Sequence, residues 1–348
     1  MMKFWDREKE KEWLKRYLKS EPNAILFVYG PKSSGKSTLL QKVAQEVDGK
    51  INFYWYDLRG KVVSSYRDVL GVFFKEKGWK EKVLESIGKI LKFNIYTFEL
   101  DGEELTKVLR KEYDAFEIME NQLSKDMEKG SKPVIVFDEL QKLKDVYMNG
   151  NGDGQKPQRP LVKELFNFFV RLTKVLHLSH VIVMSSDTFF IEEVYADSTL
   201  KNCSRYYLVD FFDDETAYNI LVNEGIDEKD AKEIVEKAGG VPWILEEVLE
   251  SDQPLQVLED LKTQAKSDLR EKLAELSKKS LKVYEDAREF LITLLNKEEI
   301  EYIGRNREKL ELLVQMEILF YDPLKGKARF QTKLDELAAR EILKEQRR

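Results

Sequence analysis

Short runs of consecutive apolar residues alternate, up to about residue 210, with longer stretches in which apolar residues recur every three or four positions. The short runs have the length of buried strands, and the longer stretches have the period of amphipathic helices. The runs predicted as strands are Ala24–Tyr29, Ile51–Leu58, Pro133–Asp138, His180–Met184 and Tyr206–Asp210. Strands that alternate with helices favour an α/β fold, here a parallel five-stranded sheet with helices on both faces.

Two stretches break this alternation. Between the second and third strands, Lys92–Leu100 is expected to hold a small extra hairpin. Residues 148–160 are rich in glycine, asparagine and proline, which predicts a loop that is either a mobile active-site loop or a surface insertion.

The rest of the chain has a mainly helical pattern. Acidic and proline start signals, with glycines as stop signals, predict helices that begin at Asp213, Asp227, Pro242 and Pro254. Further on, three helical stretches, a hairpin pattern and a last helix have the layout of a winged helix-turn-helix. We therefore expect three domains: an α/β core over residues 1–211, a helical lid over 212–278 and a winged-helix-like domain over 279–348.

A glycine-rich segment directly follows the first predicted strand. It reads Gly-Pro-Lys-Ser-Ser-Gly-Lys-Ser, which matches the phosphate-binding P-loop pattern G-x-x-x-x-G-K-S, and a helical pattern resumes behind it. In this strand–loop–helix setting, backbone N–H groups and the helix N-terminus would bind the phosphates of a nucleotide. The residues predicted to bind the nucleotide are Gly30, Pro31, Lys32, Ser33, Ser34, Gly35, Lys36, Ser37 and Thr38.

Within this segment, Lys36 would contact the β- and γ-phosphates and the Ser37 hydroxyl would ligate Mg²⁺. The third predicted strand ends in two carboxylates that complete the site. Asp138 is predicted to hold Mg²⁺ through water, and Glu139 to act as a base or water-orienting residue at the γ-phosphate. This pair favours hydrolysis of ATP to ADP and phosphate. No N-K-x-D-type element that would read guanine is present, which argues against a GTPase.

Two further catalytic roles are assigned from position. Ser186, behind the fourth strand, is predicted to contact the γ-phosphate or the attacking water, with Ser185 and Asp187 as alternatives and a helix N-cap as the competing interpretation. Arg205, at the start of the fifth strand, is predicted to stabilise charge at the γ-phosphate, with Arg171 as the alternative. A surface ion pair is the competing interpretation for both arginines.

Together and in this order, these motifs resemble those of the archaeal ATPase family, a branch of the P-loop NTPases related to AAA+ and STAND proteins and to origin-recognition initiators. The resemblance covers about residues 1–250 and includes the segments Phe4–Glu8, Tyr29–Ser37, Asp138–Gln141, Ser185–Ser186 and Gly239–Pro242. It implies that the segment around Arg7 lies against the adenine and that Pro242, in a G-x-P motif of the lid, packs near the base. Arg7 as a solvated charge at a helix start, and Pro242 as the first residue of a helix, are the plainer interpretations.

Composition limits the partners. Charged residues make up 35% of the chain, the net charge is −6, there is one cysteine, and no apolar run approaches the ~20 residues of a membrane span. We expect a cytoplasmic protein without a membrane partner, an ATPase that acts as a slow nucleotide-dependent switch. The alternative is an ATP-regulated DNA-binding protein, in which the C-terminal domain binds DNA through Arg305, Arg307, Lys309, Lys325, Lys327 and Arg329. Over residues 281–348 the basic and acidic residues are equal in number, with 14 of each. A protein partner is equally compatible, and monomer, dimer and ring remain open.

Overall fold

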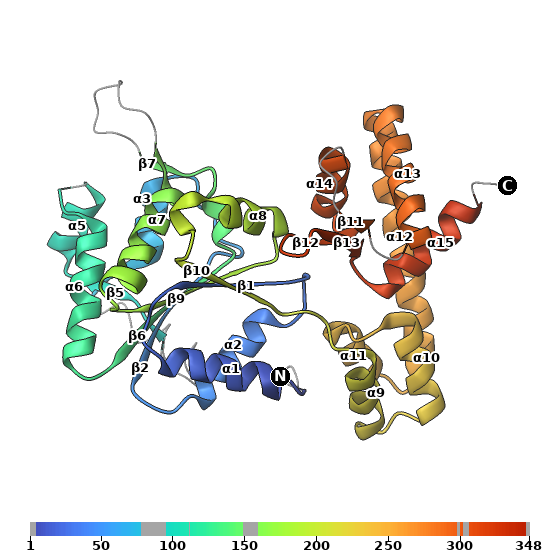
Figure 1. The fold of residues 1–348 in the computed structure, drawn as a ribbon, viewed down its shortest axis with the longest axis horizontal. Helices are drawn as coiled ribbons and strands as arrows, with labels where there is room; N and C mark the ends of the chain where they lie inside the picture. Colours follow the sequence, from blue (N-terminus) through green and yellow to red (C-terminus); the bar gives the residue numbers. More distant parts are fainter. Residues whose placement is uncertain are drawn as a thin grey trace. The chain divides into compact units, whose positions relative to one another are not determined.

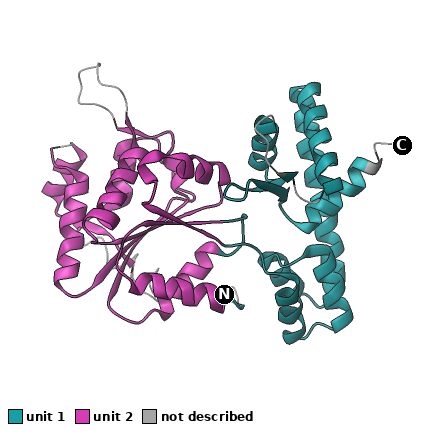
Figure 2. Ribbon diagram, in the orientation of Figure 1, with its two compact units in different colours: residues 1–6, 30–35, 209–348 teal, residues 7–29, 36–208 magenta. Residues whose placement is uncertain are grey.

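The computed structural model describes residues 5–77, 95–110, 112–148, 159–297, 300–301 and 306–345. The chain forms two compact units (Figure 2). Unit 1 comprises residues 1–6, 30–35 and 209–348, and unit 2 comprises residues 7–29 and 36–208. The predicted loop over 148–160 lies almost entirely outside the described residues.

Unit 2 is built on a six-stranded parallel sheet with strand order β10-β1-β9-β6-β2-β4 (Figure 1). Its strands are β1 (Ile25–Tyr29), β2 (Ile51–Asp57), β4 (Ile95–Tyr96), β6 (Lys132–Asp138), β9 (His180–Ser185) and β10 (Ser204–Leu208). The α/β prediction and all five predicted strands are confirmed. The sixth strand, β4, was not predicted because a two-residue segment has too few positions to show a period.

Helices cover both faces of this sheet, with α1 and α2 on one face and α7 and α8 on the other (Figure 1). The helices of unit 2 are α1 (Glu8–Lys19), α2 (Lys36–Glu46), α3 (Tyr66–Phe73), α5 (Gly102–Leu109), α6 (Ala115–Glu128), α7 (Leu161–Val170), η2 (Arg171–Val175) and α8 (Thr188–Ala196), with short 3₁₀ turns η1 (Leu140–Leu143) and η3 (Ser198–Leu200). Two small sheets, β3 (Phe74–Glu76) with β5 (Phe98–Leu100) and β7 (Tyr147–Met148) with β8 (Arg159–Pro160), complete the unit.

The hairpin predicted over Lys92–Leu100 is wrong for the described part of that segment. β4 pairs in parallel with β2, and β5 pairs in parallel with β3, so the two short strands have different partners. Aromatic packing explains the placement, since the ring of Phe98 stacks on Tyr54 of β2 with centroids 4.5 Å apart. Residues 92–94 lie outside the described part of the chain.

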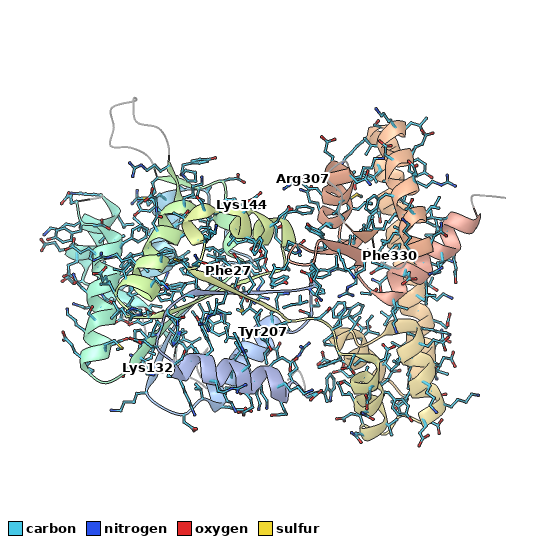
Figure 3. The ribbon with its side chains drawn as sticks, viewed as in Figure 1. Phe27, Lys132, Lys144, Tyr207, Arg307 and Phe330 are labelled. Atoms are coloured by element: carbon cyan, nitrogen blue, oxygen red, sulfur yellow. The ribbon has the colours of Figure 1, made fainter. Side chains whose placement is uncertain are left out.

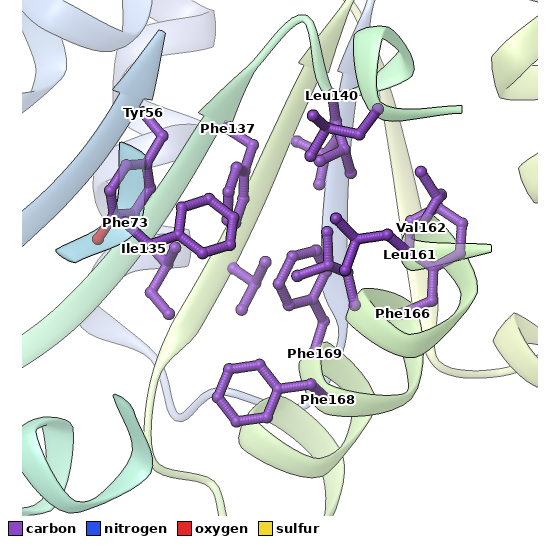
Figure 4. Close-up of a cluster of buried hydrophobic side chains, with 14 of the residues drawn as sticks. Tyr56, Phe73, Ile135, Phe137, Leu140, Leu161, Val162, Phe166, Phe168 and Phe169 are labelled. Carbon is purple, nitrogen blue, oxygen red and sulfur yellow. The ribbon is translucent and has the colours of Figure 1, made fainter. Parts of the chain in front are cut away.

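The core of unit 2 is rich in aromatic side chains that hold the end of β6 (Figure 4). Phe137 is fully buried, and its ring lies 5.2 Å from Tyr56, 5.5 Å from Phe73 and 5.1 Å from Phe169. On β1, which β9 separates from β6, Phe27 (labelled in Figure 3) stacks on Tyr206 of β10 with ring centroids 5.4 Å apart. Each such ring contributes about 2–3 kcal/mol on burial, so the residue that follows Phe137 is held in place by packing.

His180 is an unusual member of this interior. It begins β9, is 1% exposed, and its Nε2 lies 3.1 Å from the Ser20 carbonyl oxygen while its ring packs against Tyr17 at 4.7 Å. Burial lowers the pKa of its imidazole to about 4. The ring is therefore neutral in the folded protein at neutral pH.

We expect His180 to make the protein less stable in mild acid. In the unfolded chain the imidazole takes up a proton near pH 6.5, whereas the folded protein resists protonation down to about pH 4. The stabilisation that depends on the neutral His180 ring is complete above pH 6.5, declines below that pH and is lost as the pH falls through 4. About 2 kcal/mol of the unfolding free energy should therefore disappear between pH 7 and 5. Urea unfolding at both pH values should show this loss in the wild type and a smaller loss in His180→Gln. His177→Gln, which changes an exposed histidine, is the control; equal losses in all three proteins would contradict the assignment.

Unit 1 contains the mainly helical C-terminal part of the chain. Its helices are α9 (Asp214–Asn223), α10 (Glu228–Ala238), α11 (Pro242–Leu249), α12 (Pro254–Lys279), α13 (Leu281–Lys297), α14 (Arg307–Gln315) and α15 (Lys333–Glu345), and its strands are β11 (Ile300–Glu301), β12 (Leu319–Asp322) and β13 (Lys327–Phe330). The predicted helix starts are confirmed: Asp213 and Asp227 are the N-cap residues of α9 and α10, and prolines open α11 and α12.

The predicted C-terminal hairpin is also confirmed, since β12 and β13 pair antiparallel and β11 adds a third strand. Its identification as a winged helix stays a prediction, as do the expected domain boundaries at 211 and 278. The helices of the expected lid share a buried core, and Leu334 of α15 belongs to that core. No helix in the part of the chain that the structure describes has both the length and the apolar character that crossing a bilayer requires.

Candidate functional site

The glycine-rich loop Gly30–Gly35 connects β1 to α2. A Cβ atom at Gly30 would lie 2.1 Å from the Val209 carbonyl oxygen, so this position admits glycine alone. Ser33 and Gly35 have positive φ angles of 59° and 89°, and the Ser34 N–H donates to the Pro31 carbonyl oxygen at 3.2 Å. Residues in this left-handed region turn successive N–H groups toward one side, which is the conformation of an anion-binding loop.

Lys36 and Ser37 follow the loop as the first two residues of α2. The Lys36 side chain is buried, with 7% of the residue exposed. Burial lowers the pKa of its ammonium group to about 8, and the carboxylates of Glu139 and Asp138 act against that shift. A bound phosphate would further stabilise the charged form of this ammonium group.

Asp138 is the last residue of β6 and is 2% exposed. The Ser37 hydroxyl donates to Asp138 Oδ2 at 2.7 Å, so the two predicted metal ligands lie in direct contact. Burial raises the pKa of the Asp138 carboxyl, and the hydrogen bond from Ser37 acts in the opposite direction. A hydroxyl and a carboxylate oxygen at one point are the hard oxygen donors that Mg²⁺ prefers, so the residues present fit that ion.

Glu139 directly follows the strand in a left-handed conformation, with φ 64°. Its carboxylate accepts hydrogen bonds from Gln141 Nε2 and, at 3.2 Å, from the Ser186 hydroxyl. The Ser185 hydroxyl in turn donates to Gln141 Oε1 at 2.9 Å. Three residues from two adjacent strand ends therefore orient one carboxylate, and the left-handed backbone costs about 1 kcal/mol or more that this network offsets.

The structure divides the roles considered for Ser185, Ser186 and Asp187. The Ser186 hydroxyl donates to the Glu139 carboxylate at 3.2 Å, and its contact with the γ-phosphate or the attacking water stays a prediction. Asp187 is the helix cap, because its carboxylate accepts the Phe190 N–H at 3.0 Å at the start of α8. Sequence reasoning missed the positioning contacts of Gln141, although the Asp-Glu-Leu-Gln segment already marked this residue.

Arg59 is the second residue that sequence reasoning missed. It lies just beyond β2, and its Nη2 donates to Asp138 Oδ2 at 2.7 Å. Its guanidinium also contacts both carboxylate oxygens of Asp57, with Nε 3.0 Å from Oδ1 and Nη2 3.0 Å from Oδ2. The available signal was an arginine two residues after a strand-end aspartate, which becomes informative only once β2 is known to lie beside β6.

The other predicted site residues lie elsewhere or stay untested. Arg205 is the second residue of β10, near the amino end of the strand, and its positive charge acts to lower the pKa of Tyr17 and of His180. The site residues, by contrast, cluster at the carboxyl ends of the strands. Arg171 forms a bidentate ion pair with Glu120, at 2.7 and 3.0 Å, which matches the surface-pair interpretation.

The resemblance implies that the segment around Arg7 lies against the adenine and that Pro242 packs near it. Arg7 precedes α1, is 6% exposed, contacts Glu10 at 3.2 Å, and lies near enough to lower the pKa of Lys36. Pro242 is the first residue of α11, behind Gly240, where a Cβ would clash with the Phe212 carbonyl oxygen. Their roles toward a base stay predictions.

Three of the six basic residues proposed for DNA binding are paired with acids. Lys309 lies 3.0 Å from Asp286, Lys325 lies 3.7 Å from Asp322, and Arg329 pairs with Asp210. Arg329 also lies over the rings of Phe320 and Phe211, at 5.0 and 5.8 Å. Arg305 lies outside the described residues. Charges neutralised in this way do not support the DNA-binding alternative.

Sequence comparison finds close relatives over nearly the whole chain. A protein of Methanocaldococcus jannaschii described as an uncharacterized ATP-binding protein is 40% identical, and the match covers 93% of this chain and 90% of the relative. A Pyrococcus abyssi protein with the same description is 32% identical over 98% of this chain and 99% of its own length.

Structural comparison agrees on the fold. A Walker-type ATPase of Pyrococcus abyssi superposes with a TM-score of 0.64 at 19% identity, covering 97% of this chain and 96% of the other. The ORC2 protein of Aeropyrum pernix superposes with a TM-score of 0.51 at 10% identity, covering 99% and 95%. At these identities the likeness shows a shared fold.

Family models match both parts of the chain. Residues 256–343 match the C-terminal domain of MJ1010-like uncharacterized ATP-binding proteins. Residues 4–248, well over half the chain, match the ATPase domain predominantly from Archaea. Together with the relatives above, this match confirms the resemblance drawn from the motifs: the chain belongs to the archaeal ATPase family.

Proposed function

We propose that this protein binds ATP with Mg²⁺ at the P-loop, hydrolyses it slowly to ADP and phosphate, and acts as a nucleotide-dependent conformational switch. The observation that carries the proposal is the contact of Ser37 with Asp138 at 2.7 Å, with the oriented Glu139 as the next residue in the chain. The names of the relatives as ATP-binding proteins support it.

The loop Gly30–Gly35 and the first turn of α2 are one continuous segment, and they would hold the phosphates. Lys36 would contact the β- and γ-phosphates, where its ammonium balances their charge. The Ser37 hydroxyl and the Asp138 carboxylate would hold Mg²⁺, Asp138 through water. When bound, the metal neutralises charge on the β- and γ-phosphate oxygens.

Glu139 would accept the proton of the attacking water. Gln141 and Ser186 fix its carboxylate, so the acceptor oxygen is oriented before the substrate arrives. Phosphoryl transfer to water needs positioning and charge balance more than covalent chemistry. Glu139, Lys36 and the metal ligands supply these requirements.

A direct ion pair supports the switch. Lys32, in the P-loop, has its Nζ 2.7 Å from Glu317 Oε1, in the turn that precedes β12. Glu317 has a left-handed φ of 55°, and both side chains are more than half exposed. An anionic phosphate in the loop would compete with Glu317 for Lys32, so nucleotide binding would loosen the loop from the C-terminal strands.

Three measurements on the purified chain test this proposal. Calorimetry should detect binding of Mg-ATP, phosphate release should show multiple turnovers, and amide exchange near Glu317 should increase when nucleotide binds. Absence of binding by a folded protein would overturn the whole proposal. Binding without turnover would remove the hydrolase, and unchanged exchange near Glu317 would remove the switch.

A further inference from the structure

Arg59 places a positive charge on the oxygen atom at which the predicted metal ligands meet. Asp138 Oδ2 accepts one hydrogen bond from Ser37 and one from Arg59 Nη2, both at 2.7 Å. Nothing in the reaction proposed above assigns a role to this arginine. Its guanidinium stays bound to Asp57 through three contacts of 3.0 to 3.2 Å.

The two acids differ sharply in exposure. The Asp138 side chain is 2% exposed, whereas the side chains of Arg59 and Asp57 are 51% and 43% exposed. A carboxylate taken out of water is costly unless a cation or hydrogen bonds compensate it. Arg59, in direct contact with Asp138, therefore stabilises its ionised form as long as no metal ion is bound there.

Mg²⁺ and Arg59 compete for Asp138 Oδ2. A magnesium ion that uses Ser37 and the water-mediated Asp138 contact would lie within a few ångström of the guanidinium, and like charges at that distance in a partly buried site repel strongly. Water that bridges Mg²⁺ to Asp138 through Oδ2 also needs a lone pair on that oxygen, and Ser37 and Arg59 occupy both of them. Both cannot hold Asp138 Oδ2 in the arrangement described.

We propose that Arg59 is a placeholder cation, which neutralises Asp138 in the nucleotide-free protein and leaves it when a magnesium nucleotide binds. This inference rests on the proposed function. Asp57 is the pivot, because its bidentate contact holds the guanidinium while the half-exposed side chain swings away from Asp138. Arg59 thereby sets the Mg²⁺ concentration at which nucleotide is bound tightly.

The test measures Mg²⁺ dependence without any turnover. A fluorescent N-methylanthraniloyl ADP is added to the full-length protein in EDTA, Mg²⁺ is titrated in, and anisotropy reports binding. In Arg59→Gln the Mg²⁺ concentration for half-maximal binding should fall about tenfold, since the competing cation is gone. Arg59→Lys keeps the charge but cannot bridge Asp57 and Asp138 bidentately, so its midpoint should fall about threefold.

Arg171→Gln is the matched control, because it removes an arginine that is bidentate to a surface glutamate, and its midpoint should stay within twofold of wild type. A midpoint in Arg59→Gln equal to or above that of wild type overturns the inference. If that variant does not fold, the lysine variant decides by the same criterion. If the wild type itself shows no Mg²⁺-dependent ADP binding, the proposed function fails and the inference fails with it.

Discussion

Replacing Lys36 with alanine should weaken Mg-ATP binding at least a hundredfold, to the point where calorimetry detects no heat. Lys36 is the residue proposed to contact the β- and γ-phosphates, and it is buried with its pKa lowered to about 8. A charge-assisted contact to phosphate in such surroundings contributes about 2–5 kcal/mol when one partner is removed.

The same helix provides a matched control. Lys42 lies in α2, is partly exposed and pairs with Glu46 at 3.2 Å, so Lys42→Ala removes the same side chain outside the site. That variant should bind Mg-ATP as the wild type does. If Lys36→Ala, shown by circular dichroism to be folded, retained affinity within tenfold of wild type, the triphosphate would not bind where we place it.

Replacing Glu139 with glutamine should leave ATP binding within a fewfold and lower the turnover rate by about 10²–10⁴. Glutamine has the shape of glutamate and can still contact Ser186 and Gln141. Its amide cannot take the proton of the attacking water at neutral pH. Single-turnover phosphate release, measured beside the calorimetric dissociation constant, separates chemistry from binding.

Glu120→Gln serves as the matched control for this change. Glu120 is held in an ion pair by Arg171, and its neutralisation should leave both binding and turnover unchanged. A Glu139→Gln protein that releases phosphate at the wild-type rate would remove Glu139 from the mechanism. A protein that loses binding as well would make this residue part of the binding site instead.

Much of the fold and the core of the site could be predicted because the signals are local. The P-loop is one continuous segment, and Asp138 and Glu139 terminate an unbroken apolar run. Such patterns can be recognised from a short stretch of sequence alone. Ser37 and Asp138 were each predicted as Mg²⁺ ligands, and the structure places them in contact although 101 positions separate them.

The contacts that were missed depend on strand order, which no local pattern contains. Arg59 reaches Asp138 because β2 lies beside β6 in the sheet, although about 70 residues separate these strands in the chain. Arg205 illustrates the converse. Its place in a strand was predicted, but the site lies at the carboxyl ends of parallel strands and this residue lies near an amino end.

Leu334 bears on how any partner of the C-terminal segment should be sought. It comes from α15, yet its side chain, 3% exposed, is buried among residues of α9 to α12. A chain that ends at residue 279 would expose that apolar surface to water. The phenotype of such a chain would therefore reflect misfolding of the shortened protein. Mapping by surface point substitutions avoids this artefact and is the sounder genetic approach.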